Sequence, residues 1–213
     1  MRIRRKPNLI PRMERCAHVL IEDPAALKGE WLDRFPGHSA LWLELGCGKG
    51  RFTADTAEKN PDVLLVAIEK VADAMIIGLE RAFDRCIENV RFIDADALAL
   101  PVLFAQDEVD RLFLNFSDPW PKNRDAKHRL TSPGFLALYE SVLKPDGEIH
   151  FKTDNAPLFE YSVETLLKEG WTLSELTRDL HANGVIGVMT DYEAKFHEQG
   201  VKINRLVARK EKR

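Results

Sequence analysis

Cysteine is scarce in this chain, and its few copies form no pattern. Only Cys16, Cys47 and Cys86 occur among 213 residues. An odd number of cysteines that stand far apart indicates neither a disulfide framework nor a CxxC metal site. We therefore expect small buried thiols, no disulfide and no bound metal.

Long apolar runs are also missing. The longest uncharged apolar run, ALALPVLFA at 97–105, contains Pro101 and is far shorter than the roughly 20 residues of a membrane-spanning helix. The first residues, MRIRRKPNLIPRMERC, lack the apolar stretch of a signal peptide. Because 45% of the residues are hydrophobic and 31% are charged, we expect a soluble, cytoplasmic protein with no membrane partner. Both a monomer and a homodimer fit this composition.

Neither sign of charge is in large excess, since the formal net charge is −3. The distribution is uneven, however. Six Lys/Arg residues stand against one acid in 1–15 and again in 202–213, and four stand against one in 120–130, so the remainder is strongly acidic. Three concentrated basic segments favour a polyanionic partner, although solubilising tails would account for the two ends. We expect residues 1–21 to form a basic, flexible segment and residues 22–213 a single domain.

Apolar runs alternate with segments of helical spacing, which predicts an α/β fold with a mainly parallel sheet. The expected strands are 41–45, 63–69, 90–94, 110–116, 148–153, 171–176 and 202–208. The main expected helices cover 51–60, 71–87, 133–144 and 156–170. Most of the strands are apolar on both faces, so helices should cover both faces of the sheet.

The first expected strand runs into a glycine-rich loop, ELGCGKGRF, with Gly46, Gly48 and Gly50. At this position glycines allow a tight turn and a close approach of the backbone to a ligand. Glu69 ends the second strand, where a carboxylate can bind both hydroxyls of an adenosine ribose. Glu44, two residues before the first glycine, would repel the pyrophosphate of a dinucleotide. It suits the positively charged groups of S-adenosylmethionine instead.

A second loop, NFSDPWPKNRDAKHR at 115–129, joins an acid and an aromatic residue to a basic run. Pro119 and Pro121 fix φ and disfavour helical backbone before them, which predicts a stiff, extended conformation for Asp118 and Trp120. A carboxylate, an aromatic face and neighbouring cations suit a nucleic-acid base and its phosphates. An ordinary polar surface loop contains the same residue types.

The glycine loop resembles motif I of the class I S-adenosylmethionine-dependent methyltransferases. That resemblance implies a Rossmann-like fold: a seven-stranded, mostly parallel sheet with a reversed last strand and helices on both faces. It also implies that 22–213 form one methyltransferase domain with an acid near the adenine. Asp96 matches this position, and Asp94 is its nearby competitor.

Three further motifs, DPWPKxRxxKxR, KTDN and TDYEAKFHEQG, are similar to those of the bacterial tRNA (guanine-N7-)-methyltransferases. With the RRKP segment, this resemblance covers nearly the whole chain. It implies transfer of the methyl group of S-adenosylmethionine to N7 of a guanosine in the variable loop of tRNA. The base would be unstacked into the pocket, with Trp120 or Tyr192 as a stacking face.

The resemblance and the glycine loop together give the expected roles. Asp118 is the expected catalytic residue and is also expected to contact the cofactor. The other expected cofactor-binding residues are Glu44, Gly46, Gly48, Gly50, Glu69 and Asp96. The expected substrate contacts are Lys122, Asp154, Thr190, Tyr192 and Glu193, and the expected RNA contacts are Arg124, Lys127, His128 and Arg129.

Other interpretations of the same residues remain open. Asp118-Pro119 is similar to the Asp/Asn-Pro-Pro-aromatic motif of enzymes that methylate exocyclic amines, which would make adenine or cytosine the acceptor. A non-catalytic RNA-binding protein that keeps a cofactor-like fold is the alternative from another class. Thr190 and Glu193 also fit a simple capping box.

Overall fold

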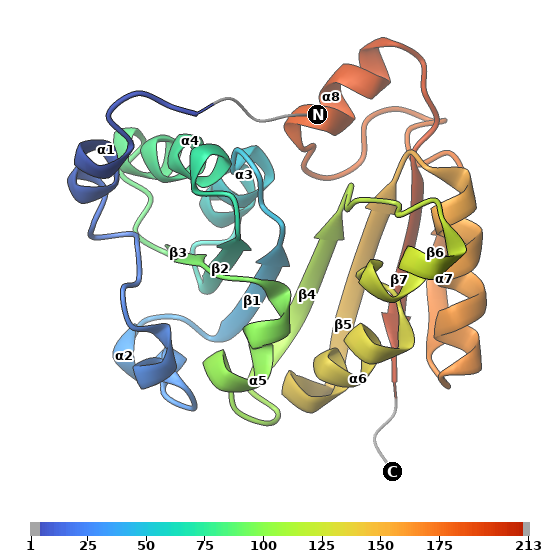
Figure 1. Ribbon diagram of the computed structural model, residues 1–213, viewed down its shortest axis with the longest axis horizontal. Coiled ribbons are helices and arrows are strands. Elements are labelled where there is room, and N and C mark those ends of the chain that lie inside the picture. The colour runs from blue at the N-terminus through green and yellow to red at the C-terminus, as the bar shows by residue number, and fades with distance from the viewer. Residues whose placement is uncertain (1–4, 211–213) are drawn as a thin grey trace.

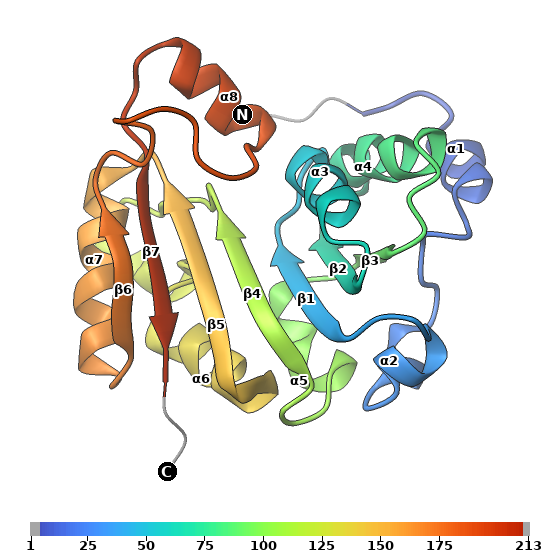
Figure 2. The same cartoon turned by 180° about the vertical axis from the view of Figure 1, so that it is seen from behind.

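The computed structural model describes residues 5–210, and a seven-stranded sheet runs through its centre (Figures 1 and 2). The strand order is β3-β2-β1-β4-β5-β7-β6. The strands are β1 (Ala40–Leu45), β2 (Val63–Glu69), β3 (Val90–Asp94), β4 (Val109–Asn115), β5 (Leu143–Thr153), β6 (Thr172–Thr177) and β7 (Asn204–Arg209). Strands β1 to β5 pair in parallel, whereas β7 runs antiparallel to β5 and β6. The predicted sheet with a reversed last strand is confirmed.

Helices cover both faces of the sheet, as the apolar strands predicted (Figure 2). One face carries α1 (Leu9–Arg15), α3 (Arg51–Lys59) and α4 (Ala72–Asp84). The other carries α2 (Trp31–Arg34), α5 (Leu100–Leu103), α6 (Pro133–Val142) and α7 (Ala156–Lys168). Short 3₁₀ helices are η1 (Pro24–Leu27), η2 (Ala97–Ala99) and η3 (Asn123–His128).

Strand β5 begins at Leu143, earlier than the expected start at residue 148. Pro145, Asp146 and Gly147 had indicated a break there. The strand accommodates them through an irregularity, because Val109 pairs with Leu143 while Arg111 pairs with Glu148.

The N-terminal segment differs from the flexible segment expected over residues 1–21. Helix α1 lies on α4, where Arg12 donates to both carboxylate oxygens of Glu80. Cys16 and Val19 are buried, and Leu20 forms an isolated bridge with Phe92 of β3. The segment packs on the domain because its apolar residues reach the core and its arginine pairs with an acid of α4. Residues 1–4 lie outside the described part of the chain.

The strand connections create a switch point at the carboxyl edge of the sheet, between β1 and β4. From β1 the chain proceeds outward to β2 and β3, and then crosses to β4 on the other side of β1. Ligands of open α/β sheets bind at such a switch point, beyond the carboxyl ends of the strands. Helix α8 (Asp191–Glu198) lies beyond this same edge (Figure 1).

Residues 5–210 contain neither a membrane-spanning helix nor a metal cluster, and their cysteines are free thiols. No helix in this range has the length and apolar character needed to cross a membrane. The same range holds no cluster of His, Cys, Asp and Glu that could bind a metal ion. Cys16 and Cys47 are buried thiols as expected, but Cys86 is exposed, because it follows the last turn of α4 in a left-handed conformation.

Candidate active site

The glycine loop connects β1 to α3 and is held by backbone hydrogen bonds to the end of β2. Gly46 and Cys47 both donate to the carbonyl of Ile68. Gly50 has φ 68°, and a Cβ there would lie 2.5 Å from the Cα of Gly78 in α4. Only glycine therefore allows α3 and α4 to approach this closely. A Cβ at Gly46 or Gly48 would meet nothing within 4 Å, so this side of the loop is open to a ligand.

Glu69 fixes the loop from the end of β2. One carboxylate oxygen accepts from the backbone N–H of Gly48 at 2.9 Å, and the other accepts from Val71 at 3.0 Å. Each oxygen keeps a further lone pair, so the carboxylate can also accept from ribose hydroxyls. The expected position of Glu69 beside the glycine loop is thus present in the structure.

Glu44 is buried beneath the loop and has two neutral donors. Thr53 of α3 donates to one carboxylate oxygen at 2.5 Å, and the side-chain amide of Asn115 in β4 donates to the other at 3.0 Å. Burial raises the pKa of Glu44, while the hydrogen bonds from Thr53 and Asn115 and the charge of Lys152 oppose this effect. The amide oxygen of Asn115 is buried and has no hydrogen-bond partner among the described residues.

This arrangement fits S-adenosylmethionine. Around Glu44, acceptors are in excess, and an unpartnered buried acceptor beside a carboxylate is stabilised by a ligand that brings a positively charged donor. The amino-acid end of S-adenosylmethionine carries such an ammonium group. Glu69 and the open side of the glycine loop then lie where ribose hydroxyls would bind.

The two acids considered for the adenine lie in the turn after β3. Asp94 ends the strand and pairs in register with Glu69, while Asp96 caps η2 by accepting from the backbone of Leu98. Lys70 donates to the other oxygen of Asp96 at 3.4 Å. Both acids are exposed. Partial burial raises the pKa of Asp94.

The loop after β4 carries the expected catalytic acid at the same edge. Asp118 is exposed, three residues beyond the end of β4. The expectation of an extended Trp120 is wrong, because its φ is 43°, and Phe116 is also left-handed with φ 53°. The ring of Trp120 lies 5.1 Å from that of His128, centroid to centroid. The backbone of the loop therefore changes direction at Phe116 and Trp120, on either side of Asp118.

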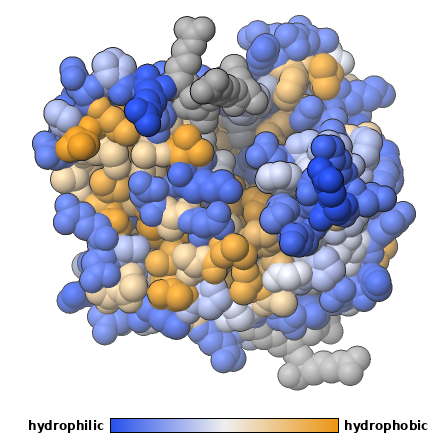
Figure 3. All heavy atoms as spheres, viewed as in Figure 1, coloured by the Kyte–Doolittle hydropathy of each residue, from blue (hydrophilic) through white to orange (hydrophobic). Residues whose placement is uncertain are grey.

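The basic run forms η3 and divides into exposed and buried members. Lys122, Arg124, Lys127 and His128 are exposed, and strongly hydrophilic side chains gather over this region in the space-filling view (Figure 3). Arg129 is buried and donates to the backbone carbonyls of Pro119 and Trp120. The expected RNA contact by Arg129 is therefore not what the structure shows, because its guanidinium is engaged inside the protein.

The TDYEAKF motif forms α8 and its cap. Thr190 accepts from the backbone of Glu193, and the Glu193 side chain accepts from the backbone of Thr190, which confirms the capping box. Glu193 has 0% exposure and pairs with Lys152 at 2.5 Å and with His181 at 3.0 Å. In the structure Glu193 contacts protein groups, and its expected substrate contact stays a prediction. Its carboxylate holds α8 on the sheet.

The remaining expected substrate residues converge on the edge that carries Asp118. Asp154 directly follows β5 and is exposed. Tyr192 is 48% exposed on α8, with its ring stacked on Phe196 at 6.4 Å between centroids. The ring of Phe196 in turn lies 6.1 Å, centroid to centroid, from that of Phe116 in the loop after β4. The structure therefore brings together loops that follow β1, β2, β4 and β5 with helix α8.

Four residues of this region were missed in the sequence, namely Asn115, Lys152, His181 and Arg81. Arg81 of α4 donates to both oxygens of Asp191 in α8, at 2.9 and 3.1 Å. Lys152 stands two residues after His150 in EIHFKT, so both polar side chains occupy the same face of a buried strand. Polar residues at alternate positions of an apolar strand were the signal that could have indicated Lys152.

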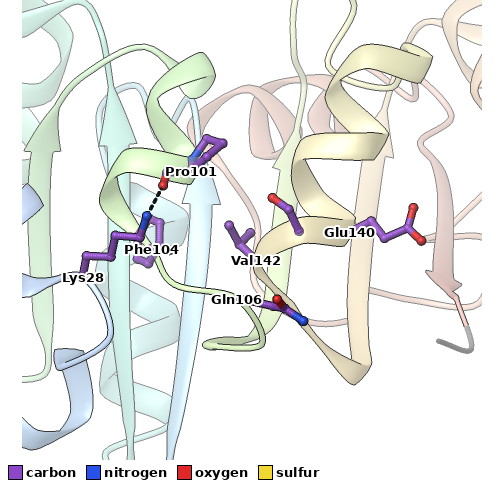
Figure 4. A pocket seen from close by; sticks show the side chains of 7 residues that line it. Lys28, Pro101, Phe104, Gln106, Glu140 and Val142 are labelled. Atoms are coloured by element: carbon purple, nitrogen blue, oxygen red, sulfur yellow. Dashed lines mark hydrogen bonds between the residues drawn. The ribbon is translucent and has the colours of Figure 1, made fainter. Parts of the chain in front are cut away.

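A separate pocket lies at the opposite edge of the sheet, near the start of β4 and β5 (Figure 4). Its lining comprises Lys28, Pro101, Phe104, Gln106, Glu140, Ser141 and Val142. Lys28 donates to the carbonyl of Pro101 at 2.6 Å. None of the expected site residues lines it.

The strand order of the sheet, the glycine loop after β1 and the acids at the switch point together define a class I methyltransferase. Solved structures share the fold: an antibiotic-related methyltransferase has a TM-score of 0.62 with 16% identity, covering 84% of this chain and 91% of that chain. The 30S ribosomal A1408 methyltransferase from an uncultured bacterium has a TM-score of 0.57 with 16% identity, covering 85% and 92%.

Sequence comparison gives the particular family. Residues 38–206 match the family described as putative methyltransferase. The tRNA (guanine-N(7)-)-methyltransferase of Lactococcus lactis subsp. cremoris strain MG1363 is 42% identical over 98% of both chains. The tRNA (guanine-N(7)-)-methyltransferase of Bacillus cytotoxicus is 41% identical over 98% of this chain and 97% of its own. The chain belongs to the tRNA (guanine-N7-)-methyltransferase family.

Proposed function

We propose that this chain transfers the methyl group of S-adenosylmethionine to N7 of a guanosine in the variable loop of tRNA. The products are 7-methylguanosine in tRNA and S-adenosylhomocysteine. The observation that carries the proposal is that Asp118 is exposed after β4, the parallel neighbour of the strand that leads into the glycine loop, in a chain 42% identical to tRNA (guanine-N(7)-)-methyltransferases. A tRNA substrate implies a cytoplasmic enzyme.

The chemistry requires alignment more than proton removal. Guanine N7 is an in-plane acceptor at the edge of the base and has no proton to lose, so no strong general base is needed. S-adenosylmethionine supplies an activated methyl group on its sulfonium. The work left to the chain is to hold N7 in line with that methyl group, and positioning of this kind contributes about 7 to 11 kcal/mol.

Asp118 provides recognition and charge. Its carboxylate can accept from N1–H and the 2-amino group of guanine, which leaves N7 on the far side of the base. Charge-assisted hydrogen bonds of this type contribute about 1.5 to 3 kcal/mol each. As the methyl group arrives, positive charge grows on the ring and strengthens these bonds. Adenine presents an acceptor in place of N1–H and would leave the acid unpaired.

The surrounding residues have separable tasks. Thr190, Tyr192, Asp154 and Lys122 lie at the same edge and are proposed to contact the substrate. Trp120, which is 37% exposed, and Tyr192 offer the aromatic faces on which an unstacked base could stack. The exposed Arg124, Lys127 and His128 are proposed to contact phosphates.

The proposal is tested by incubating the protein with labelled S-adenosylmethionine and an unmodified tRNA transcript, followed by nucleoside analysis. The expected product is 7-methylguanosine at one variable-loop position. A methylated adenosine or cytidine would support the exocyclic-amine alternative. Binding of tRNA without methyl transfer, in a protein that also binds S-adenosylmethionine, would support a non-catalytic RNA-binding protein.

A further inference from the structure

The backbone carbonyls of Pro119 and Trp120 accept hydrogen bonds from a side chain at the end of the same loop, that of Arg129. Pro119 and Pro121 carry no N–H, so only Asp118 and Trp120 of the DPWP segment offer backbone donors. Arg129, eight residues beyond the second proline, supplies further donors. Its Nε lies 3.1 Å from the carbonyl oxygen of Pro119 and 3.3 Å from that of Trp120, and its Nη2 donates to Trp120 at 2.9 Å.

The guanidinium is itself held from the other side. Its Cζ lies 4.2 Å from the centroid of the Tyr161 ring in α7, and Arg129 is only 9% exposed. A planar guanidinium stacks on an aromatic face while its edge donates hydrogen bonds, which a lysine cannot do. Arg129 thus ties the DPWP turn to the end of η3 and to helix α7.

The backbone beside Asp118 needs such support. Phe116 and Trp120 flank Asp118 at two residues on either side, and both adopt positive φ values, 53° and 43°. Residues with a side chain rarely adopt this conformation, and it persists only where the surroundings enforce it. Arg129 bonds directly to Trp120, one of the two strained positions.

We propose that Arg129 is a positioning residue whose guanidinium fixes the Pro119–Trp120 backbone and thereby sets the location of the Asp118 carboxylate. This inference rests on the proposed function. Arg129 contacts neither tRNA nor cofactor in this role. Arg124, five residues earlier, has a side chain that is 77% exposed and serves as the matched arginine for phosphate contact.

Three variants separate positioning from phosphate binding. Arg129→Ala is expected to lower the single-turnover rate at saturating tRNA by about 100-fold, the cost of a misplacement of roughly 1 Å. Its tRNA affinity and the salt dependence of that affinity should match those of the unaltered protein. Arg124→Ala should weaken tRNA binding and lower the salt slope by about 0.7 to 0.9. Arg34→Ala, in α2 far from the site, is the baseline.

Arg129→Lys distinguishes geometry from charge and also covers the case in which Arg129→Ala does not fold. Lysine keeps the positive charge, but it cannot stack on the Tyr161 ring while it donates to the carbonyls of both Pro119 and Trp120. We therefore expect a slow single-turnover rate with normal tRNA affinity. A full rate in Arg129→Lys, or a reduced salt slope in Arg129→Ala, would overturn the proposal. Thermal unfolding and S-adenosylhomocysteine binding establish that each variant is folded.

Failure of the proposed function would be recognised separately. If the unaltered protein and Arg34→Ala methylate a base other than guanine, the function is wrong, but the Arg129 variants can still be compared on that product. If both methylate guanine N7 and Arg129→Lys is equally fast, the positioning role alone is wrong.

Discussion

Side chains of one chemical type do different work within the same loop. Arg124 faces solvent, whereas Arg129 is buried against Tyr161 and two backbone carbonyls. The acids divide in the same way, because Asp118 is exposed and Glu193 is enclosed by Lys152 and His181. Burial and partners, more than residue type, separate the groups available to tRNA from those that shape the site.

We expect Asp118→Asn to lower the single-turnover rate by roughly 10- to 150-fold, since the amide lacks the charge that strengthens hydrogen bonds to guanine in the transition state. The tRNA affinity and its salt slope should not change, because phosphate contacts remain. Rapid quench and filter binding across a salt series measure the two quantities. A full single-turnover rate would remove Asp118 from the mechanism.

Glu69 gives a prediction on the cofactor alone. Glu69→Gln keeps an oxygen toward the loop but loses the charge and one acceptor, so S-adenosylhomocysteine should bind about tenfold more weakly. Binding of tRNA should be little affected. Calorimetry with Glu164→Gln, an exposed residue of α7, as the control measures the difference. Equal affinities in both variants would mean that Glu69 does not contact the ribose.

At the scale of elements, α8 is attached by two ion pairs to opposite sides of the switch point. Glu193 bonds to Lys152 of β5, and Asp191 bonds to Arg81 of α4. Val188, just before α8, packs against the core cluster that includes residues of α3 and α4, and its carbonyl accepts from Lys152 at 2.9 Å. The helix that carries Tyr192 is therefore fixed relative to the two halves of the sheet between which the cofactor would lie.

Loss of the buried ion pair between Lys152 and Glu193 should strongly reduce stability. Burial lowers the pKa of Lys152, and the charge of Glu193 counteracts this. Lys152→Met would leave the Glu193 carboxylate buried without its main partner, which costs about 3 to 5 kcal/mol of unfolding free energy. Urea unfolding measures this loss. Arg178→Ala, which breaks an exposed pair with Glu160, should change little, and an equally small effect in Lys152→Met would contradict the prediction.

The centre of the sheet also predicts a pH dependence. Burial lowers the pKa of His150 in β5 from 6.5 to about 4. Between these values the unfolded chain binds a proton that the folded chain does not, so stability should fall as the pH drops from 6.5 toward 4. Burial alone would raise the pKa of Glu148, but hydrogen bonds from His150 and Arg209 help to lower it to about 2. Protonation of Glu148 therefore causes a further loss of stability as the pH falls below 4.5.

Substitution of His150 isolates its contribution to the pH dependence of stability. In His150→Phe, the loss of unfolding free energy between pH 6.5 and 5 should be smaller than in the unaltered protein, because the titrating group is gone. Urea unfolding at pH 7, 6.5, 5.5 and 5 gives the comparison. Identical pH profiles would show that His150 is not held neutral in the folded state.

On the scale of the whole molecule, sequence periodicity was sufficient to predict the strands of the sheet. It was not sufficient to predict the buried contacts within the site. Strands such as VLLVAIE are apolar throughout, and local pattern alone identifies them as buried. The hydrogen-bond and ion-pair partners of Arg129 and Glu193 could not be predicted from local sequence pattern. Glu193 meets Lys152, 41 positions away, only after β5 and α8 have docked, and nothing local distinguishes a buried arginine from its exposed neighbours.

Ion pairs within the protein also decide which basic residues are available to tRNA. Arg12 pairs with Glu80 and Arg15 with Asp84, so part of the N-terminal charge is neutralised by α4. Arg124 and Lys127 are exposed on η3, in the loop region that follows β4 and Asp118. We therefore expect phosphate contacts to concentrate on η3, while the arginines of α1 mainly attach that helix to the domain.

Two double variants of equal charge change test this division. Arg124→Ala with Lys127→Ala should weaken tRNA binding and reduce the slope of log affinity against log salt by about 1.4 to 1.8, from two contacts of roughly 0.7 to 0.9 each. Arg12→Ala with Arg15→Ala removes the same charge but should lower thermal stability and leave the salt slope nearly unchanged. If both pairs reduce the slope equally, tRNA contacts α1 as well, and the ion pairs with α4 must open when tRNA binds.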